Sequence, residues 1–256
     1  MKTSNFNTNK ASFSINGSKL IKEYYRLNDA IYADKEYELL KSIEKSYQSI
    51  TINNWHYRAL NVLDNPTKFS IEMEYINAGT MRDFYTATSN PKIYKHMGIW
   101  LGLLHECTMD KEKNTVLTFN DYSDTNLLVD IHKREIVAID PGKYNNIRNH
   151  QSISIVVGVL SIQRTVIKIN KSIPKAIISN YQFLKGYIST IENNKLPNIR
   201  QGLKYMSYRQ RILWFRKKLS LRLNIIRTFE MAFITIQLKI FSNYFYLKSK
   251  FTGDLN

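Results

Sequence analysis

The sequence has few of the residues from which disulfides and zinc sites are built. It contains one cysteine, Cys107, so an intrachain disulfide is excluded and a reducing compartment is favoured. Because Cys107 closes an apolar segment, we expect it to pack against the core rather than to act as a nucleophile. The five histidines are scattered without HExxH spacing, and no CxxC pair occurs, so a bound zinc ion is not expected.

Three longer signals are also missing. The G-x-x-x-x-G-K-[ST] pattern does not occur, which excludes the P-loop as the ATP-binding scaffold. The first residues, MKTSNFNTNK, have no apolar stretch after the lysine, so we expect no signal peptide. Uncharged runs near the C-terminus, such as Met231 to Leu238, are much shorter than the ~20 residues of a transmembrane helix.

What is present is enough apolar sequence for a substantial core. The chain has 256 residues, of which 43% are hydrophobic. This size suits one bilobal unit better than two independent domains.

The stretch from residue 119 to 140, FNDYSDTNLLVDIHKREIVAID, carries the most specific pattern in the chain. Asp121 is followed by Asn126, an apolar run, a polar turn, a second apolar run and then Asp140. Two strands and a turn would bring these three polar groups together. Phosphoryl transfer needs such a set, with one carboxylate facing the attacking hydroxyl, and an amide and a carboxylate holding magnesium against the ATP phosphates.

This stretch resembles the catalytic loop of the protein-kinase-like superfamily, in particular its small-molecule branch of aminoglycoside phosphotransferases, choline kinases and lipopolysaccharide-core sugar kinases. Members typically have H-G-D-x-x-x-x-N, an apolar strand and then I-D-x-G or D-F-G. The histidine is replaced here by Phe119. The resemblance implies that Asp121 orients or deprotonates the acceptor, and that Asn126 and Asp140 bind magnesium.

The resemblance implies an α+β, bilobal protein-kinase-like fold. We expect an N-lobe of residues 1–75, with a small sheet and one helix that bind the nucleotide. A mostly helical C-lobe of residues 76–256 would contain the catalytic loop at 119–142 and a basic helical C-terminal part. Its later helices are expected at 153–167, 175–191 and 203–247.

Upstream, KFSIEMEYINAGTMRDFY, from Lys68 to Tyr85, is similar to the last N-lobe strand and the hinge of kinases. By analogy, Met73 flanks the adenine, and the backbones of Glu74 and Ile76 pair with the adenine edge. The alternative is an edge strand of alternating apolar residues followed by an ordinary turn at 77–79.

Still further upstream, SKLIKEYY is similar to the V-A-I-K strand of kinases and makes Lys22 the candidate contact for the ATP phosphates. The following helix, expected at 33–47, offers Glu36 as the ion-pair partner of Lys22, with Glu38 as the competing choice. The alternative is an exposed helix face with ordinary i,i+4 charge pairs.

The nucleotide-clasping glycine loop of kinases has no clear counterpart. The segment TSNFNTNKASFSING holds a single glycine, so Ser4, Asn5, Asn7 and Asn9 would have to form the turn. Glycine normally lets backbone amides approach phosphate without a Cβ in the way. We therefore expect a shortened or divergent loop.

Charge is distributed very unevenly along the chain. Residues 141–256 contain 20 Lys and Arg against three acidic residues, a net charge of +17, whereas residues 1–140 carry −1. Between Tyr208 and Lys250, basic residues such as Arg216, Lys217 and Lys218 alternate with apolar ones at helical spacing. Three interpretations remain open: an anionic membrane surface, nucleic acid, or C-lobe helices with a basic solvent face, of which membrane is favoured over nucleic acid.

The sequence thus predicts an enzyme that transfers the γ-phosphoryl of Mg-ATP to a hydroxyl of a sugar, a surface glycan of the lipopolysaccharide-core type or another small molecule. We expect it in the cytoplasm, peripheral on the inner face of the membrane if the basic helices bind lipid. One alternative is a non-catalytic kinase-like binding module tethered by its basic C-lobe. A protein Ser/Thr/Tyr kinase is disfavoured, because no A-P-E segment follows Gly142.

Overall fold

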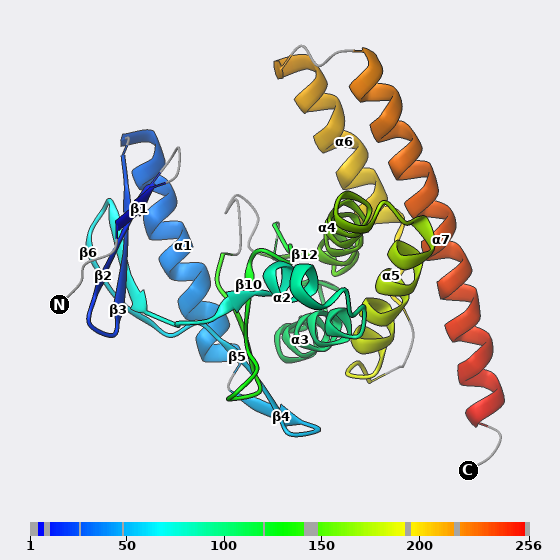
Figure 1. Ribbon diagram of the computed structural model, residues 1–256, viewed down its shortest axis with the longest axis horizontal. Coiled ribbons are helices and arrows are strands. Elements are labelled where there is room, and N and C mark those ends of the chain that lie inside the picture. Colours follow the sequence, from blue (N-terminus) through cyan, green and yellow to red (C-terminus); the bar gives the residue numbers. More distant parts are fainter. Residues whose placement is uncertain are drawn as a thin grey trace.

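The computed structural model describes residues 5–7, 11–25, 27–47, 49–119, 121–140, 148–192, 196–217 and 221–253, with the side chains of 5–7, 27–32, 209–226 and 248–253 left aside. Figure 1 shows a smaller part, made of strands and one long helix, beside a larger part that is mostly helical. The predicted α+β bilobal fold class is therefore confirmed.

The smaller part is built on an antiparallel sheet with strand order β1-β2-β3-β7-β6. In its register, Leu20 lies opposite Met73, and Lys22 lies opposite Ile71. The strands are β1 (Asn5–Asn7), β2 (Ala11–Asn16), β3 (Lys19–Tyr24), β6 (Val62–Thr67) and β7 (Ser70–Glu74).

Helix α1 (Leu27–Ser46) packs against this sheet. It begins before the expected start at residue 33. Its buried positions include Ala33, Glu36, Leu40 and Ile43, at the spacing of three or four residues that places side chains on one helix face. One member of that face, Glu36, is charged and therefore needs a buried partner.

A second sheet, with strand order β4-β5-β11-β10-β8, connects the two parts of the molecule. Strand β5 runs parallel to β11, and the other neighbouring pairs are antiparallel. The predicted boundary between residues 75 and 76 stays a prediction, since strands from both sides of it share this sheet. The strands are β4 (Ile50–Ile52), β5 (Trp55–Ala59), β8 (Gly79–Thr80), β10 (Leu127–Asp130) and β11 (Glu135–Ala138).

The larger part is centred on two helices that approach each other closely. A Cβ atom added at Gly98 of α3 would lie 1.9 Å from the carbonyl oxygen of Phe183, and one at Gly186 of α5 would lie 2.0 Å from that of Lys95. Only glycine permits this contact between backbones. The elements are α2 (Met81–Thr88), α3 (Ile93–Thr108), α4 (Ser152–Asn170), α5 (Ile173–Ile188) and the short pair β9 (Val116–Leu117) and β12 (Arg148–Asn149).

Two expectations about helix ends are corrected. Helix α5 begins at Ile173, so Pro174 lies inside its first turn, where the fixed φ of proline is tolerated. Cys107 is exposed on the last turn of α3 and does not pack against the core. On this turn the buried side chains are His105 and Thr108, which leaves Cys107 on the outer face.

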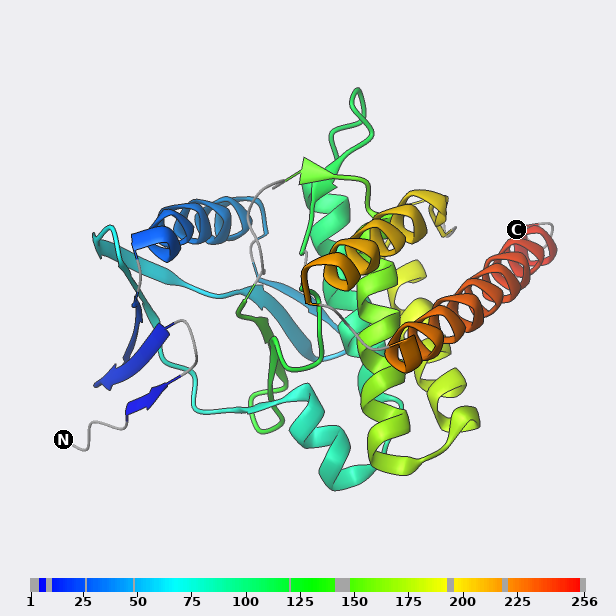
Figure 2. The ribbon, with the colours of Figure 1, turned by 90° about the horizontal axis from the view of Figure 1, so that it is seen from above.

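The basic C-terminal part forms two helices, α6 (Arg200–Lys217) and α7 (Leu221–Gly253). In Figure 2, α7 lies along the outer edge of the helical part. The side chains of Arg216 and Lys217, and the whole of Lys218, lie outside the described residues. Among the described helices, α4 alone has the length and apolar composition of a membrane span, and most of it is buried within the molecule.

Candidate active site

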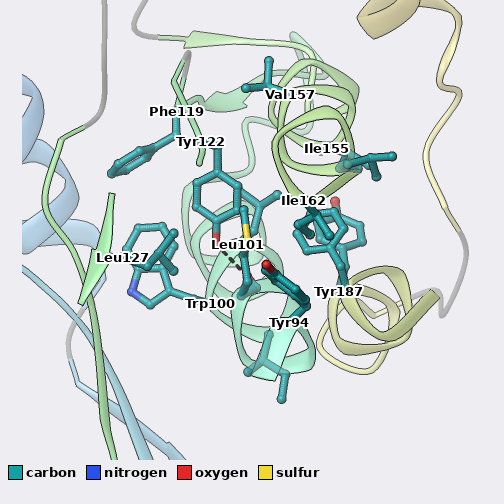
Figure 3. Close-up of a cluster of buried hydrophobic side chains, with 14 of the residues drawn as sticks. Tyr94, Trp100, Leu101, Phe119, Tyr122, Leu127, Ile155, Val157, Ile162 and Tyr187 are labelled. Atoms are coloured by element: carbon teal, nitrogen blue, oxygen red, sulfur yellow. Dashed lines mark hydrogen bonds between the residues drawn. The ribbon is translucent and has the colours of Figure 1, made fainter. Parts of the chain in front are cut away.

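Aromatic packing anchors the predicted catalytic loop to the core. Phe119 is buried and lies edge-on against Trp100, with ring centroids 5.2 Å apart. Tyr122 is buried beside them and donates a hydrogen bond of 2.6 Å to the carbonyl of Met97 (Figure 3). The position at which similar kinases have a histidine is therefore filled by a ring that holds the loop through apolar contacts.

Asn126 forms hydrogen bonds both with Asp121 at the start of the catalytic loop and with Ile139, the residue before Asp140. Its side-chain nitrogen donates 2.8 Å to the carbonyl of Asp121, and its own carbonyl accepts 2.9 Å from the amide of Ile139. Because only the nitrogen can donate, the amide orientation is fixed, and Oδ1 of Asn126 is left for another partner. Asp121, Asn126 and Asp140 therefore meet at one end of the β10–β11 hairpin.

The loop contains a further acidic residue that sequence analysis missed. Asp124 is fully buried and accepts hydrogen bonds from Arg82 at 2.8 Å, from Ser161 at 3.2 Å and from Tyr94 at 3.3 Å. Burial and then the Asp124 carboxylate raise the pKa of Tyr94, which keeps this phenol a donor. In the sequence, Asp124 is only one more polar residue of a turn, and its three partners are distant in the chain.

On the opposite side of the site, Lys22 and Glu36 form a buried ion pair. Nζ of Lys22 donates 2.8 Å to each carboxylate oxygen of Glu36, and the hydroxyl of Tyr24 donates to the same carboxylate. Glu38 is exposed, so the ion-pair partner of Lys22 is Glu36 and not Glu38. Burial opposes the charge of Lys22, but Glu36 and then Asp140 raise its pKa above the ordinary value. The structure thus brings Lys22 close to Asp140.

The predicted hinge follows β7. Met73 is buried in an apolar cluster that includes Val137 and the partly buried Ile139, the residue before Asp140. The strand that leads to Asp140, β11, thus contacts the predicted adenine pocket.

The backbone groups of the hinge are only partly engaged by the chain itself. The amide of Glu74 donates to Asn61, and its carboxylate binds Arg58, which also pairs with Glu135 at 2.7 Å. The carbonyl of Ile76 accepts from the amide of Ala78. The backbone groups that would form the predicted hydrogen bonds with adenine are therefore the carbonyl of Glu74 and the amide of Ile76.

The predicted nucleotide loop falls largely outside the described residues. Asn5 and Asn7 lie in β1, whereas Ser4 and Asn9 are not described, and neither are residues 141–147 after Asp140. The roles of Lys22, Met73, Glu74 and Ile76 toward ATP stay predictions.

Asn126 and Asp140 fit a magnesium ion. An amide oxygen and a carboxylate are the oxygen ligands that magnesium prefers, and the ion usually takes only one or two protein ligands beside phosphates and water. Among the described residues, no group of three or more His, Cys, Asp or Glu side chains forms a metal site. A two-ligand site completed by nucleotide phosphates is the arrangement that this donor set supports.

A cavity of about 350 Å³ opens beside Asp121. Sequence analysis found only Asp121 among its lining residues, because the others are spread over the chain between residues 82 and 227. They are Arg82 of α2, Ser123 and Thr125 of the loop, Val157, Leu160, Ser161 and Arg164 of α4, Met206 of α6 and Arg227 of α7.

No family model matches the chain, and no curated protein sequence matches it. Solved structures do match, and they define the class of fold: that of small-molecule kinases of the protein-kinase-like type. One is the aminoglycoside phosphotransferase APH(2'')-Ib with bound ADP, which is 12% identical, has a TM-score of 0.54 and is matched over 93% of each chain. Another is a choline/ethanolamine kinase family protein from Mesorhizobium loti, 9% identical, with a TM-score of 0.51 over 96% of this chain and 92% of the other.

Proposed function

We propose that the protein is a phosphotransferase that moves the γ-phosphoryl of Mg-ATP to a hydroxyl of a sugar, a surface glycan of the lipopolysaccharide-core type or another small molecule. In the reaction, the acceptor oxygen forms a bond to the γ-phosphorus while the bond from that phosphorus to the β–γ bridging oxygen breaks. ADP leaves with the bond electrons, and the hydroxyl proton goes to the Asp121 carboxylate.

Each candidate residue has a distinct task in this proposal. Asp121 orients the acceptor hydroxyl and receives its proton, and Lys22, held by Glu36, binds ATP phosphate oxygens. Asn126 and Asp140 would hold magnesium, which, when bound, neutralises phosphate charge. Glu74 and Ile76 would bind adenine through their backbones beside the side chain of Met73.

The observation that carries the proposal is the hydrogen-bonded connection through Asn126. One residue contacts the carbonyl of Asp121 at 2.8 Å and the amide of Ile139 at 2.9 Å, so the candidate base and the candidate metal ligands are held in a fixed arrangement. The packing of Phe119 against Trp100 anchors the same loop to the core. Preorganised groups of this kind are what phosphoryl transfer requires, since it depends mainly on positioning and electrostatics.

The test is a pair of measurements on the purified protein. Mg-ATP at ~100-fold excess over its dissociation constant should stabilise the fold by about 2.7 kcal/mol, and removing magnesium should reduce this effect. Transfer of labelled phosphate from γ-labelled ATP to a panel of sugars and glycan fragments should follow. Absence of any stabilisation at millimolar Mg-ATP would contradict the proposal. Stabilisation by ATP that ignores magnesium, without transfer, would favour the non-catalytic binding module.

We further propose a peripheral position at an anionic membrane, on the cytoplasmic face. The support is a cavity of about 700 Å³ between α6 and α7, lined by Arg200, Lys204 and Lys239 among others. Near these cations, the apolar side chains of Ile236 and Ile240 are exposed. Basic and apolar side chains on one surface are typical of helices that lie in a lipid headgroup region.

Vesicle sedimentation tests the membrane proposal. Binding should rise with phosphatidylglycerol content and fall with salt. The double change Lys204→Gln with Lys239→Gln should weaken it roughly thirtyfold, since each lysine near an anionic surface contributes ~1 kcal/mol. Lys185→Gln on α5, which removes an exposed charge elsewhere, is the control. Salt-dependent binding to RNA or DNA without vesicle binding would replace the membrane with nucleic acid.

A further inference from the structure

The cavity beside Asp121 receives an arginine from each of three helices. Arg82 comes from α2, Arg164 from α4 and Arg227 from α7. Arginine is always charged and presents several donors in a planar fork, so it matches phosphate and carboxylate groups. Whether each of these arginines already has an acidic partner in the protein therefore indicates which charge a ligand in the cavity should carry.

Two of the three arginines are already neutralised by carboxylates of the protein. Arg82 pairs with the buried Asp124 at 2.8 Å, and Arg164 pairs with Glu230 at 2.7 Å. Neither pair needs a ligand to complete it.

Arg227 differs from both. Its Nη1 atom is buried and has no hydrogen-bond partner among the residues that the structure describes. The stretches 141–147 and 209–226, whose side chains are not described, contain no acidic residue, so they cannot supply a carboxylate. A buried guanidinium nitrogen without a hydrogen-bond partner is unfavourable, and such groups in native proteins call for an explanation, for which a bound ligand is one.

The position of Arg227 on α7 is fixed by contacts farther along the helix. Glu230, one turn later, holds Arg164 of α4. Gln237 accepts a hydrogen bond of 2.9 Å from Asn180 and donates one of 3.2 Å to Gln163. The contacts of Gln237 are buried and the Arg164–Glu230 pair is exposed, and together they hold α7 against α4 and α5. The helix that carries Arg227 is thus held in place beside the cavity.

We propose that the acceptor carries an anionic group, a phosphate or a carboxylate, and that Arg227 binds this group while the acceptor hydroxyl faces Asp121. This assignment rests on the proposed phosphotransferase function and adds the class of acceptor to it. The remaining wall has apolar Val157 and Leu160 beside the hydroxyls of Thr125 and Ser161, which suits a sugar ring with one apolar face. An acceptor rich in amines would meet the charge of Arg227 and be disfavoured.

Calorimetric titration of four monosaccharides tests the assignment directly: glucose 6-phosphate, glucuronate, glucose and glucosamine. Glucose 6-phosphate or glucuronate should bind at least about tenfold more tightly than glucose, because a charge-assisted arginine contact is much stronger than a neutral one. A response to the phosphate alone or to the carboxylate alone identifies which anion the cavity takes.

Three variants separate Arg227 from general charge effects. Arg227→Gln should abolish the preference for the anionic sugar, and Arg227→Lys should restore part of it, since lysine keeps the charge but loses the fork. Lys168→Gln, which removes an exposed charge on the last turn of α4, should leave the preference unchanged.

The result that overturns the assignment is equal binding of charged and neutral sugars, no binding of either anionic sugar, a preference for glucosamine, or a preference that survives Arg227→Gln. Stabilisation by Mg-ATP, measured on the same samples, keeps the two proposals apart. If Mg-ATP stabilises the protein and the anionic preference is absent, the acceptor class is wrong and the kinase proposal stands. If the anionic preference is present without any effect of Mg-ATP, the cavity is an anion site and the kinase proposal fails.

Discussion

The two sides of the candidate site differ in how their charges are satisfied. On the nucleotide side, Lys22 has both oxygens of Glu36 as partners, inside a buried contact between β3 and α1. On the acceptor side, Arg227 has a buried nitrogen without a partner among the described residues. The ion pair on the proposed nucleotide side is thus completed within the chain, whereas the proposed acceptor side keeps one buried arginine nitrogen without a partner among the described residues.

Under the proposed function, this difference separates two halves of the site. One half would bind ATP, which is the same in all such kinases, and the other would bind the acceptor, which varies between them. ATP needs the same few contacts in every kinase-like protein, so an ion pair and a short loop suffice. The wall of the cavity beside Asp121, where we propose that the acceptor binds, is assembled from residues of the catalytic loop and of α2, α4, α6 and α7. Changes on these helices are therefore expected to alter the acceptor more than the nucleotide contacts.

The largest effect is expected from the two aspartates that face the two sides. Asp121→Asn should lower turnover by roughly 10²–10⁴-fold while leaving the affinity for Mg-ATP nearly unchanged, because the carboxylate acts on the acceptor. Asp140→Asn should weaken Mg-ATP binding itself. Steady-state kinetics with nucleotide titration measure both. If each variant keeps full activity, neither residue belongs to the mechanism.

A smaller effect is expected from breaking the buried pair on the nucleotide side. Glu36→Gln removes the carboxylate that is hydrogen-bonded to the buried Lys22, which should cost about 3 kcal/mol of unfolding free energy and weaken Mg-ATP binding. Glu38→Gln, on the same helix but exposed, serves as the matched control. Denaturant unfolding and nucleotide titration give the two readouts. Equal behaviour of the two glutamine variants would mean that the pair does not position Lys22.

The smallest effect, taken per pH unit, is the change in stability expected from the two histidines of α3, His96 and His105. Burial, and then His150, lower the pKa of His105 to about 3, and burial lowers the pKa of His96 to about 4. The unfolded chain binds more protons than the folded one between these values and ~6.5. Stability is therefore full above ~6.5 and falls toward acid by about 1.4 kcal/mol per pH unit for each group. His105→Phe should flatten this fall, whereas the exposed His132→Gln should not. Unfolding curves at pH 4 to 7 measure the slope, and an unchanged slope in His105→Phe would contradict the assignment.

The elements around the catalytic loop could be predicted because their signals lie close together in the sequence. The run from Leu127 to Ile139, with its polar turn, becomes the antiparallel hairpin β10–β11. The strand with Lys22 and the strand with Met73 are also found, and they are neighbours in one sheet. Alternation of apolar and polar residues determines which way such strands face, and it needs no distant contact.

Other features could not be predicted, because they depend on which helices pack together. The partners of Asp124 come from α2, α3 and α4, and none has a fixed spacing from it in the sequence. The exposure of Cys107 follows from the rotation of α3 about its axis, which is set by the close contacts of Gly98 with α5 and of Gly186 with α3. The identity of a single residue does not show how its helix is rotated against its neighbours.

From the sequence by itself came the fold class, the order of the strands and helices around residues 119–140, and the candidate residues Lys22, Asp121, Asn126 and Asp140. The motifs that carry the resemblance to kinase-like proteins are short and local, so they can be read without the tertiary structure. The tertiary structure decided that Glu36 rather than Glu38 meets Lys22. It also decided that Arg82, Arg164 and Arg227 line one cavity with Asp121. The physical reason is that a buried charge is specified by the partner that surrounds it, and that partner is supplied by packing between elements distant in the chain.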